Sequence, residues 1–163
     1  MGRSGAAAVQ LLLRHGARVS AYDRDAEKLS GLDAEITRLS GPGLPDLARF
    51  DLAVTSPGVP VPAGARVMPE VDLAAAYLRA PLIGITGSNG KSTTTVLVGR
   101  MLEASGQRTL VGGNLGTPLC ALAEQPADWI VAELSSFQLE HAQQLRARIA
   151  VLLNLAPDHL DRH

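Results

Sequence analysis

The sequence predicts an α/β protein whose parallel strands are joined and covered by helices. Short apolar runs alternate with segments of helical spacing along the chain, which is typical of parallel strands with crossover helices. A glycine-rich turn at residues 86–92 follows one of these runs and opens a helix, an arrangement that binds phosphate. The 163 residues could hold one large domain or two small ones. We expect two domains, at residues 1–80 and 81–163, joined by a linker at residues 79–81.

The first half predicts a Rossmann-like, doubly wound parallel sheet. Strands are expected at residues 18–22, 35–39 and 51–55. Helical segments are expected at residues 4–15, 25–29, 44–49 and 68–78. Each strand is followed by a helical or turn segment, so the strands are expected to lie parallel in one sheet.

The first helix begins like half of a dinucleotide-binding fingerprint. Residues 2–5, Gly-Arg-Ser-Gly, open the helix, and the acidic Asp23 follows about 20 residues later. The complete fingerprint also needs a strand and a further glycine ahead of these residues, and the sequence contains neither there. We therefore expect that the native protein continues upstream. Three alternatives remain for the start of this helix. It could bind NAD, it could bind another nucleotide-type ligand, or it could bind no ligand and serve stability alone.

Composition excludes several classes of function. The net charge of −1 and the 3% aromatic content give no basis for binding nucleic acid. Cys120 is the single cysteine, which excludes an internal disulfide and fits a reducing compartment. No apolar run approaches the roughly 20 residues of a membrane span. A cytoplasmic protein is expected, and we predict a monomer.

The turn at residues 86–92 carries the most chemistry. A strand at residues 81–85 leads into it, and helical spacing resumes at residues 96–102. Backbone amides of the turn and of the helix start can converge on phosphate, while Lys91 adds a full charge and Ser92 a hydroxyl for Mg²⁺. The match to the general P-loop is imperfect, because its first glycine falls at Ile85. A plain strand-to-helix turn is the alternative.

Three later segments bring polar groups to the same expected sheet edge. A strand at 128–132 ends at Glu133, where a carboxylate beside a phosphate loop can hold magnesium. A strand at 109–111 leads into the glycine-rich residues 112–116, in which Asn114 is either a turn residue or a ligand contact. A last strand at 148–154 leads to Asp158 and His159, which could bind a metal or orient phosphate, or be ordinary surface. Helices are expected from residue 117 and at 137–145.

Four ordered motifs resemble those of the Mur ligase family of peptidoglycan synthesis. They are residues 84–93 (GITGSNGKST), 112–116 (GGNLG), 133–140 (ELSSFQLE) and 158–162 (DHLDR). The motif at 133–140 is similar to that of the D-glutamate-adding branch. The resemblance covers essentially the whole chain, and it accounts for the shifted glycine at Ile85. A relative of the folylpolyglutamate ligase type, a P-loop kinase or GTPase, and a non-catalytic nucleotide- or UDP-sugar-binding fragment are the alternatives.

The resemblance implies a role for each matching residue. Lys91, Glu133 and His159 would be catalytic, and Ser92, Glu133 and His159 would hold Mg²⁺. The ATP-binding residues would be Gly87, Ser88, Asn89, Gly90, Lys91, Ser92 and Thr93. The residues that contact the substrate would be Ser4, Asp23, Arg24, Gly58, Asn114 and Ser135, with the first four around uridine diphosphate. Uridine diphosphate thus replaces NAD as the expected ligand of the first helix.

The implied activity is an ATP-dependent ligase that adds D-glutamate to UDP-N-acetylmuramoyl-L-alanine through an acyl phosphate, releasing ADP and phosphate. The family has three domains, and the resemblance ends within the central one. A carbamylated lysine that bridges the metals would lie beyond His163, and the third domain closes over ATP. We therefore expect the 163-residue chain by itself to be catalytically inactive.

Overall fold

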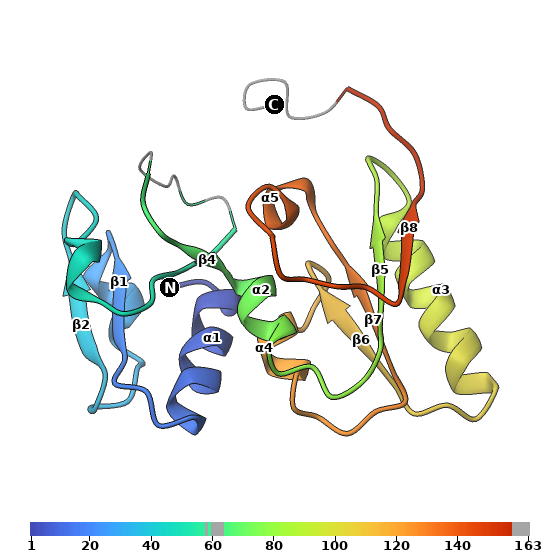
Figure 1. The fold of residues 1–163 in the computed structure, drawn as a ribbon, viewed down its shortest axis with the longest axis horizontal. Helices are drawn as coiled ribbons and strands as arrows, with labels where there is room; N and C mark the ends of the chain where they lie inside the picture. The colour runs from blue at the N-terminus through green and yellow to red at the C-terminus, as the bar shows by residue number, and fades with distance from the viewer. Residues whose placement is uncertain (58, 60–63, 158–163) are drawn as a thin grey trace.

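The computed structural model describes residues 1–57, 59 and 64–157, and shows helices packed on small parallel sheets (Figure 1). The α/β class with parallel strands is confirmed. The first half contains these elements: α1 (Arg3–Arg14), β1 (Ser20–Asp23), the 3₁₀ helices η1 (Ala26–Leu29) and η2 (Leu47–Arg49), β2 (Thr37–Ser40), β3 (Val54–Thr55), β4 (Met68–Pro69) and α2 (Glu70–Ala75). None of the helices in these described ranges has the length and apolar character needed to cross a membrane.

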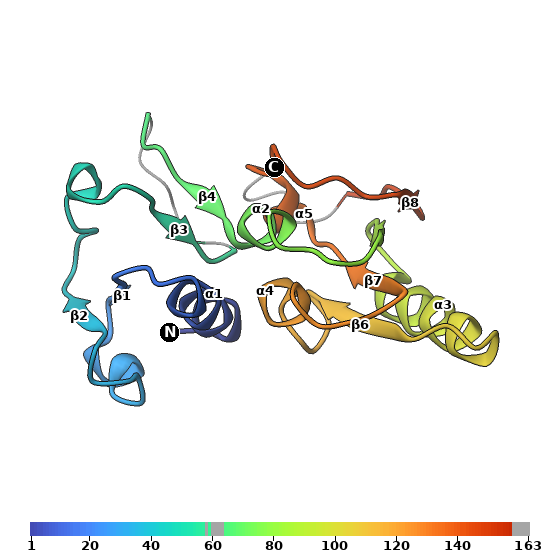
Figure 2. The same cartoon turned by 60° about the horizontal axis from the view of Figure 1, so that its bottom comes forward.

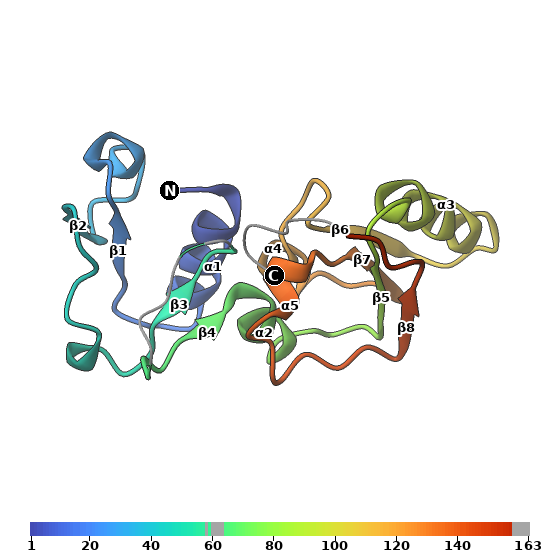
Figure 3. The same ribbon diagram turned by 90° about the horizontal axis from the view of Figure 1, so that it is seen from above.

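The strands of the first half are parallel as expected, but they form two separate sheets rather than one continuous sheet. β1 pairs with β2 and β3 pairs with β4, both in parallel, as two separate sheets of two strands each (Figure 3). The strand predicted at 51–55 shortens to Val54–Thr55, and its partner β4 lies where a helix was predicted to begin. A large cavity separates β1 from β3, so their facing edges do not exchange the ladder hydrogen bonds that would join the two sheets.

The second half is built on a four-stranded sheet. Its elements are β5 (Leu82–Thr86), α3 (Lys91–Ala104), β6 (Thr109–Gly113), α4 (Leu119–Leu122), β7 (Trp129–Glu133), α5 (Ser136–Leu139) and β8 (Ile149–Leu152). The strand order is β6-β7-β5-β8, and every neighbouring pair is parallel. The carboxyl ends of all four strands therefore meet at one edge, which confirms the placement expected from the sequence.

Alternating side chains of the sheet bury two separate cores. Leu82 and Ile130 face a cluster that contains Leu11 of α1, Val71 of α2 and Leu119 of α4. The intervening residues of β5 and β7 face the opposite side, where α3 packs. Figure 2 shows α2 and α3 on opposite sides of this sheet. The first core joins α1 and α2 to the second half, so hydrophobic packing continues across residue 80, the domain boundary that the sequence predicts.

Two buried carboxylates at the start of α2 connect it to distant backbone. Oε1 of Glu70 accepts a 2.7 Å hydrogen bond from the Cys120 amide at the start of α4, and its Oε2 has no partner among the described residues. Both oxygens of Asp72 accept hydrogen bonds from three successive amides, those of residues 143–145, at 2.7 to 3.1 Å. Backbone amides thus satisfy both oxygens of Asp72 but only one oxygen of Glu70, whose desolvation is compensated in part.

The contact with Asp72 explains why the helix predicted at 137–145 is much shorter. α5 ends at Leu139, and the amides of residues 143–145 donate to the Asp72 carboxylate instead of to carbonyls one turn earlier. The amphipathic spacing of this segment was a correct sign of burial, since Leu139, Ala142 and Leu145 pack on the first core. The Asp72 carboxylate thus takes the place of the backbone carbonyl oxygens that would accept from these amides in a helix.

A cavity-forming substitution tests the packing of α1 on the second half. Leu11 is fully buried, so Leu11→Ala is expected to lower the free energy of unfolding by about 2–5 kcal/mol in urea denaturation. Leu97→Ala is the matched control, because Leu97 of α3 is 56% exposed and should change stability by less than about 0.5 kcal/mol. Equal effects of the two substitutions would contradict a core that includes α1.

The pH dependence of stability tests the burial of Glu70. Burial raises the pKa of the Glu70 carboxyl above its ordinary value of 4.5, so above that pH the native state binds more protons than the unfolded chain and stability falls as pH rises. Glu70→Gln removes this titration and still offers an oxygen to the Cys120 amide. The free energy of unfolding of the variant should fall less between pH 4.5 and about pH 8 than that of the wild type. Glu103→Gln, at an exposed ion pair, is the control and should keep the wild-type slope.

Candidate functional site

The predicted phosphate loop lies at the carboxyl end of β5, between that strand and α3. Gly87 opens it with φ of 138°, a left-handed conformation that favours glycine. A Cβ atom on Gly87 would also lie only 3.1 Å from the backbone nitrogen and oxygen of Asn154, at the end of β8. Both the turn conformation and the close approach of the chain after β8 thus favour glycine at this position.

The Lys91 side chain folds back over the loop. Its Nζ donates hydrogen bonds to the carbonyl oxygens of Gly87 at 2.7 Å and Ser88 at 3.0 Å. The positive charge is therefore held beside the loop and the first turn of α3, where a helix start also favours an anion. This geometry can bind the phosphate chain of a nucleotide, as the sequence predicts.

Glu133 lies at the centre of the edge where the strands end. Its side chain is 3% exposed, and its two oxygens accept hydrogen bonds from opposite sides: Ser92 Oγ donates at 2.6 Å and Asn114 Nδ2 at 2.7 Å. Three residues that are far apart in the sequence thus meet at one carboxylate. The parallel register brings them together, since Glu133 is the register partner of Ile85 on β5 and of Gly113 on β6.

Gly113 permits the close approach of β6 to Glu133. Its φ is 91°, and a Cβ atom there would lie 2.3 Å from the carbonyl oxygen of Glu133. The same carbonyl accepts a 2.8 Å hydrogen bond from the Asn114 amide. The glycine-rich loop at 112–116 is therefore aimed at Glu133 by both its backbone and the Asn114 side chain.

The oxygens of Ser92 and Glu133 suit Mg²⁺, which prefers hard oxygen ligands and retains several water or phosphate ligands. Within residues 1–57, 59 and 64–157, no group of three or more His, Cys, Asp or Glu side chains is placed to hold a metal. A small protein contribution of this kind fits a magnesium ion that is shared with nucleotide phosphates. His159, the third predicted metal ligand, lies outside the described residues.

The predicted contacts for uridine diphosphate lie at a second place in the first half. A cavity of about 1190 Å³ lies between α1 and strands β1 and β3, and Ser4, Asp23 and Arg24 line it. Gly58 lies outside the described residues, although its neighbour Ser56 also lines the cavity. The structure brings three of the four predicted residues together, at the carboxyl end of β1 and the start of α1.

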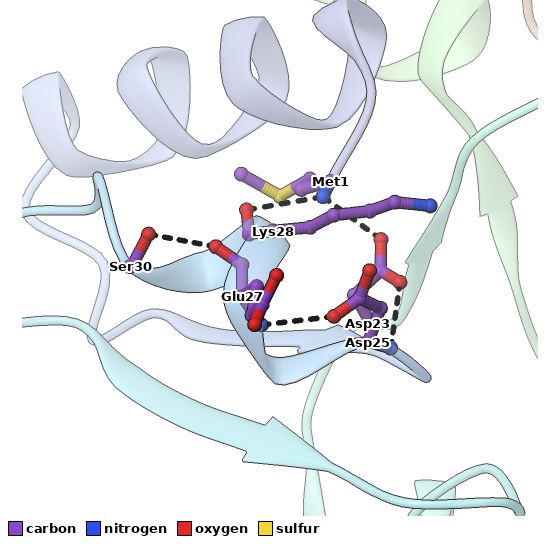
Figure 4. A network of polar contacts seen from close by, with 6 residues as sticks. All are labelled: Met1, Asp23, Asp25, Glu27, Lys28 and Ser30. Carbon is purple, nitrogen blue, oxygen red and sulfur yellow. Dashed lines mark hydrogen bonds and ion pairs between the residues drawn. The ribbon is translucent and has the colours of Figure 1, made fainter.

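Asp23 is already engaged in a polar network (Figure 4). Its Oδ2 lies 2.8 Å from the ammonium group of Met1, which also donates to the carbonyl oxygen of Lys28, and its Oδ1 accepts from the Asp25 amide. The hydrogen bond from the terminal ammonium, followed by that from the Asp25 amide, lowers the pKa of the Asp23 carboxyl. The carboxylate is thus ionised and able to accept further hydrogen bonds at the rim of the cavity.

Ser135 follows Glu133 closely and has a clear local role. It is the N-cap of α5, where its side chain and that of Gln138 each bond to the backbone of the other residue. Its predicted contact with the substrate stays a prediction. Asn154 was absent from the predicted site residues, although it contacts the phosphate loop directly. Its position at the end of an apolar strand was the only sequence signal for it.

Comparison with known proteins agrees with these features. The profile of the Mur ligase middle domain matches residues 85–163. The UDP-N-acetylmuramoylalanine--D-glutamate ligase of Anaeromyxobacter dehalogenans is 49% identical over 181 aligned residues, and that of Myxococcus xanthus is 47% identical over 182. Both alignments include all of this chain. The chain belongs to the Mur ligase family.

The chain spans 39% and 40% of the length of these two relatives. A solved structure, the UDP-N-acetylmuramate:L-alanyl-gamma-D-glutamyl-meso-diaminopimelate ligase from Neisseria meningitides, superposes with a TM-score of 0.52 over 96% of this chain and 58% of that one. Its 19% identity supports a shared fold alone. Both halves of the chain therefore share the fold of this ligase.

Removal of one donor tests the bonding of Glu133. Asn114→Leu preserves side-chain volume but leaves Glu133 Oε1 buried without this donor, so the free energy of unfolding should fall by about 1–3 kcal/mol. Gln125→Leu removes a side-chain amide from an exposed 2.7 Å bond to Ala121 and should cost less than about 0.5 kcal/mol. Urea denaturation of both variants measures the difference. Similar values for the two would show that Asn114 does not satisfy a buried carboxylate.

Proposed function

We propose that this chain supplies the ATP site and the UDP-substrate site of a ligase that joins D-glutamate to UDP-N-acetylmuramoyl-L-alanine. The observation that carries the proposal is the meeting of the Lys91 loop with Ser92, Glu133 and Asn114 at one sheet edge. The names of the relatives at 49% and 47% identity supply the substrates. Both ATP and a uridine diphosphate sugar are cytoplasmic metabolites, so we place the reaction in the cytoplasm. A monomer stays our expectation.

The reaction needs activation because a carboxylate is a poor electrophile. In the first step a carboxylate oxygen of the alanyl group attacks the γ-phosphorus of ATP, the bond to the β-phosphate oxygen breaks, and ADP leaves. In the second step the D-glutamate amine attacks the acyl carbon, loses a proton, and the C–O bond breaks to release phosphate. The result is an amide, with one ATP converted into ADP and phosphate.

The residues of the chain act on the first step by charge. Two anions must approach each other, and Lys91 beside the phosphate loop offsets their repulsion and stabilises the transferring phosphoryl group. Ser92 and Glu133 would hold Mg²⁺ with His159, and the ion when bound supplies further positive charge at the phosphate oxygens. Asn114 and Ser92 bond to the two oxygens of the same Glu133 carboxylate, so a substrate that contacts Asn114 would lie close to phosphates held at Ser92.

The cavity in the first half is our proposed site for uridine diphosphate. Ser4, Arg24 and the ionised Asp23 offer donors and acceptors around it, and Gly58 would complete this set. The start of α1 adds backbone amides that favour the diphosphate. Ser135, at the first turn of α5, is proposed to contact the substrate nearer the reacting carboxylate.

Binding and turnover test this proposal together. Calorimetry should show that the 163-residue chain binds ATP with magnesium, and that it binds UDP-N-acetylmuramoyl-L-alanine independently. In a protein of the relatives' full length, ADP release should require all three substrates and should stop when D-glutamate is omitted. ADP release that continues without D-glutamate would indicate a phosphatase or kinase activity instead.

A substitution at Lys91 tests the phosphate site. Lys91→Ala removes the charge beside the loop, and ATP affinity should fall by about 10- to 100-fold, as for a hydrogen bond to a charged group. Lys28→Ala is the matched control, because Lys28 lines the other cavity and should leave ATP affinity unchanged within about twofold. ATP affinity of the Lys91 variant equal to that of the control would remove Lys91 from the phosphate site.

A further inference from the structure

The side chain of Asn154 makes a two-way contact with the backbone of one residue of the phosphate loop. Its Oδ1 accepts a 2.9 Å hydrogen bond from the Asn89 amide, and its Nδ2 donates a 3.0 Å hydrogen bond to the Asn89 carbonyl oxygen. The two residues are 65 positions apart in the sequence. Both polar groups of Asn89 in the main chain are therefore held by one side chain from the end of β8.

The backbone around Asn154 holds the neighbouring part of the same loop. The Ser88 amide donates to the Asn154 carbonyl oxygen at 3.1 Å, and the Leu153 amide donates to the Thr86 carbonyl oxygen at 3.0 Å. The Ser88 hydroxyl donates to the Ala156 carbonyl oxygen at 3.0 Å and accepts from the Ala156 amide at 2.9 Å. The first half of the loop is thus bonded along its length to the segment that follows β8.

These bonds divide the amides of the loop into two groups. The amides of Ser88 and Asn89 already donate to Asn154, in the segment that follows β8. The amides of residues 90–93 begin α3, and none of them donates a hydrogen bond to another described residue. The second group is therefore available to an anion, and the first is not.

We infer that Asn154 is a positioning residue for ATP: it fixes the backbone of Asn89, on both sides of its Cα atom, so that the amides of residues 90–93 face the phosphates. The inference rests on the proposed ATP site. Lys91 bonds to the carbonyl oxygens of Gly87 and Ser88 in the same arrangement, so contacts within the chain hold the loop at three successive residues, Gly87, Ser88 and Asn89. A loop that is already ordered loses less conformational entropy on binding, which strengthens affinity.

Loss of the Asn154 amide would release the backbone of Asn89. Its carbonyl oxygen could then rotate toward the phosphates, where two partial negative charges would repel. The loop would also have to be ordered at the moment of binding. Both effects weaken the binding of a phosphate chain, and neither acts on a ligand in the cavity of the first half.

Asn154→Leu tests the inference, because leucine has a similar size and shape but makes no hydrogen bond. Amide hydrogen exchange measured by NMR on the nucleotide-free chain should become about tenfold faster at Asn89, as expected for the loss of one to two hydrogen bonds. The ATP Kd should rise about tenfold for the same reason, while the Kd for UDP-N-acetylmuramoyl-L-alanine stays within about twofold. Asn154→Asp keeps the acceptor for the Asn89 amide and should retain its protection.

Two further measurements separate positioning from general stability. Ser105→Ala, which removes a hydroxyl bond at the other end of α3, should change neither Kd. ATP added to the wild type should shift the NMR signals of the amides of residues 90–93 far more than those of Ser88 and Asn89.

An ATP Kd for Asn154→Leu within about twofold of wild type would overturn the inference and leave the proposed function intact. A weakening of both ligands together would also overturn it, since that marks a general loss of structure. Equal shifts of Ser88, Asn89 and residues 90–93 would overturn the division of the amides. A wild-type chain that binds no ATP would overturn the proposed function itself, and the inference with it.

Discussion

The buried carboxylate of Glu133 is the constraint on which the arrangement of the second half depends. A carboxylate that is 3% exposed needs hydrogen-bond donors, because its desolvation is otherwise costly. Ser92 provides one from the first turn of α3, and Asn114 provides the other from the loop after β6. The start of α3 and this loop both have to be in the correct position for the donors to reach. The parallel sheet meets this requirement, since it ends β5, β6 and β7 at the same edge.

The same physical requirement operates at α2. Glu70 and Asp72 are buried charged side chains, and each bonds to backbone amides of the second half rather than to a basic side chain. Asp72 in particular turns the chain at residues 143–145, just before it enters β8. Because β8 ends at the segment that holds the phosphate loop, α2 contributes to the geometry of a site that it does not touch.

Local sequence signals predicted the parts of the site that depend on chain neighbours. The glycine-rich turn before Lys91 and the carboxylate after the apolar run at 128–132 both lie where a short stretch of sequence indicated. The meeting of Ser92, Glu133 and Asn114 followed from a general property of parallel sheets, without knowledge of the register. The roles of these residues in catalysis, and the boundary at residue 80, stay predictions.

Contacts between distant residues were beyond the reach of the sequence. Helical spacing at 137–145 correctly indicated a buried face, but Asp72 supplies an acceptor that ends the helix at Leu139. The division of the first sheet into two pairs depends on whether the edges of β1 and β3 approach each other, which no local pattern encodes.

The sequence by itself determined the α/β class, the order of most elements, the glycine-rich turn before α3 and the family motifs. These features reside in periodicity, in glycine positions and in residue types at fixed spacing, all of which are local. The tertiary structure decided which amides of the loop are occupied, how Glu133 is satisfied and where the helix after residue 136 ends. Each of these depends on a hydrogen bond between residues tens of positions apart, and such partners become defined only when the strands have packed.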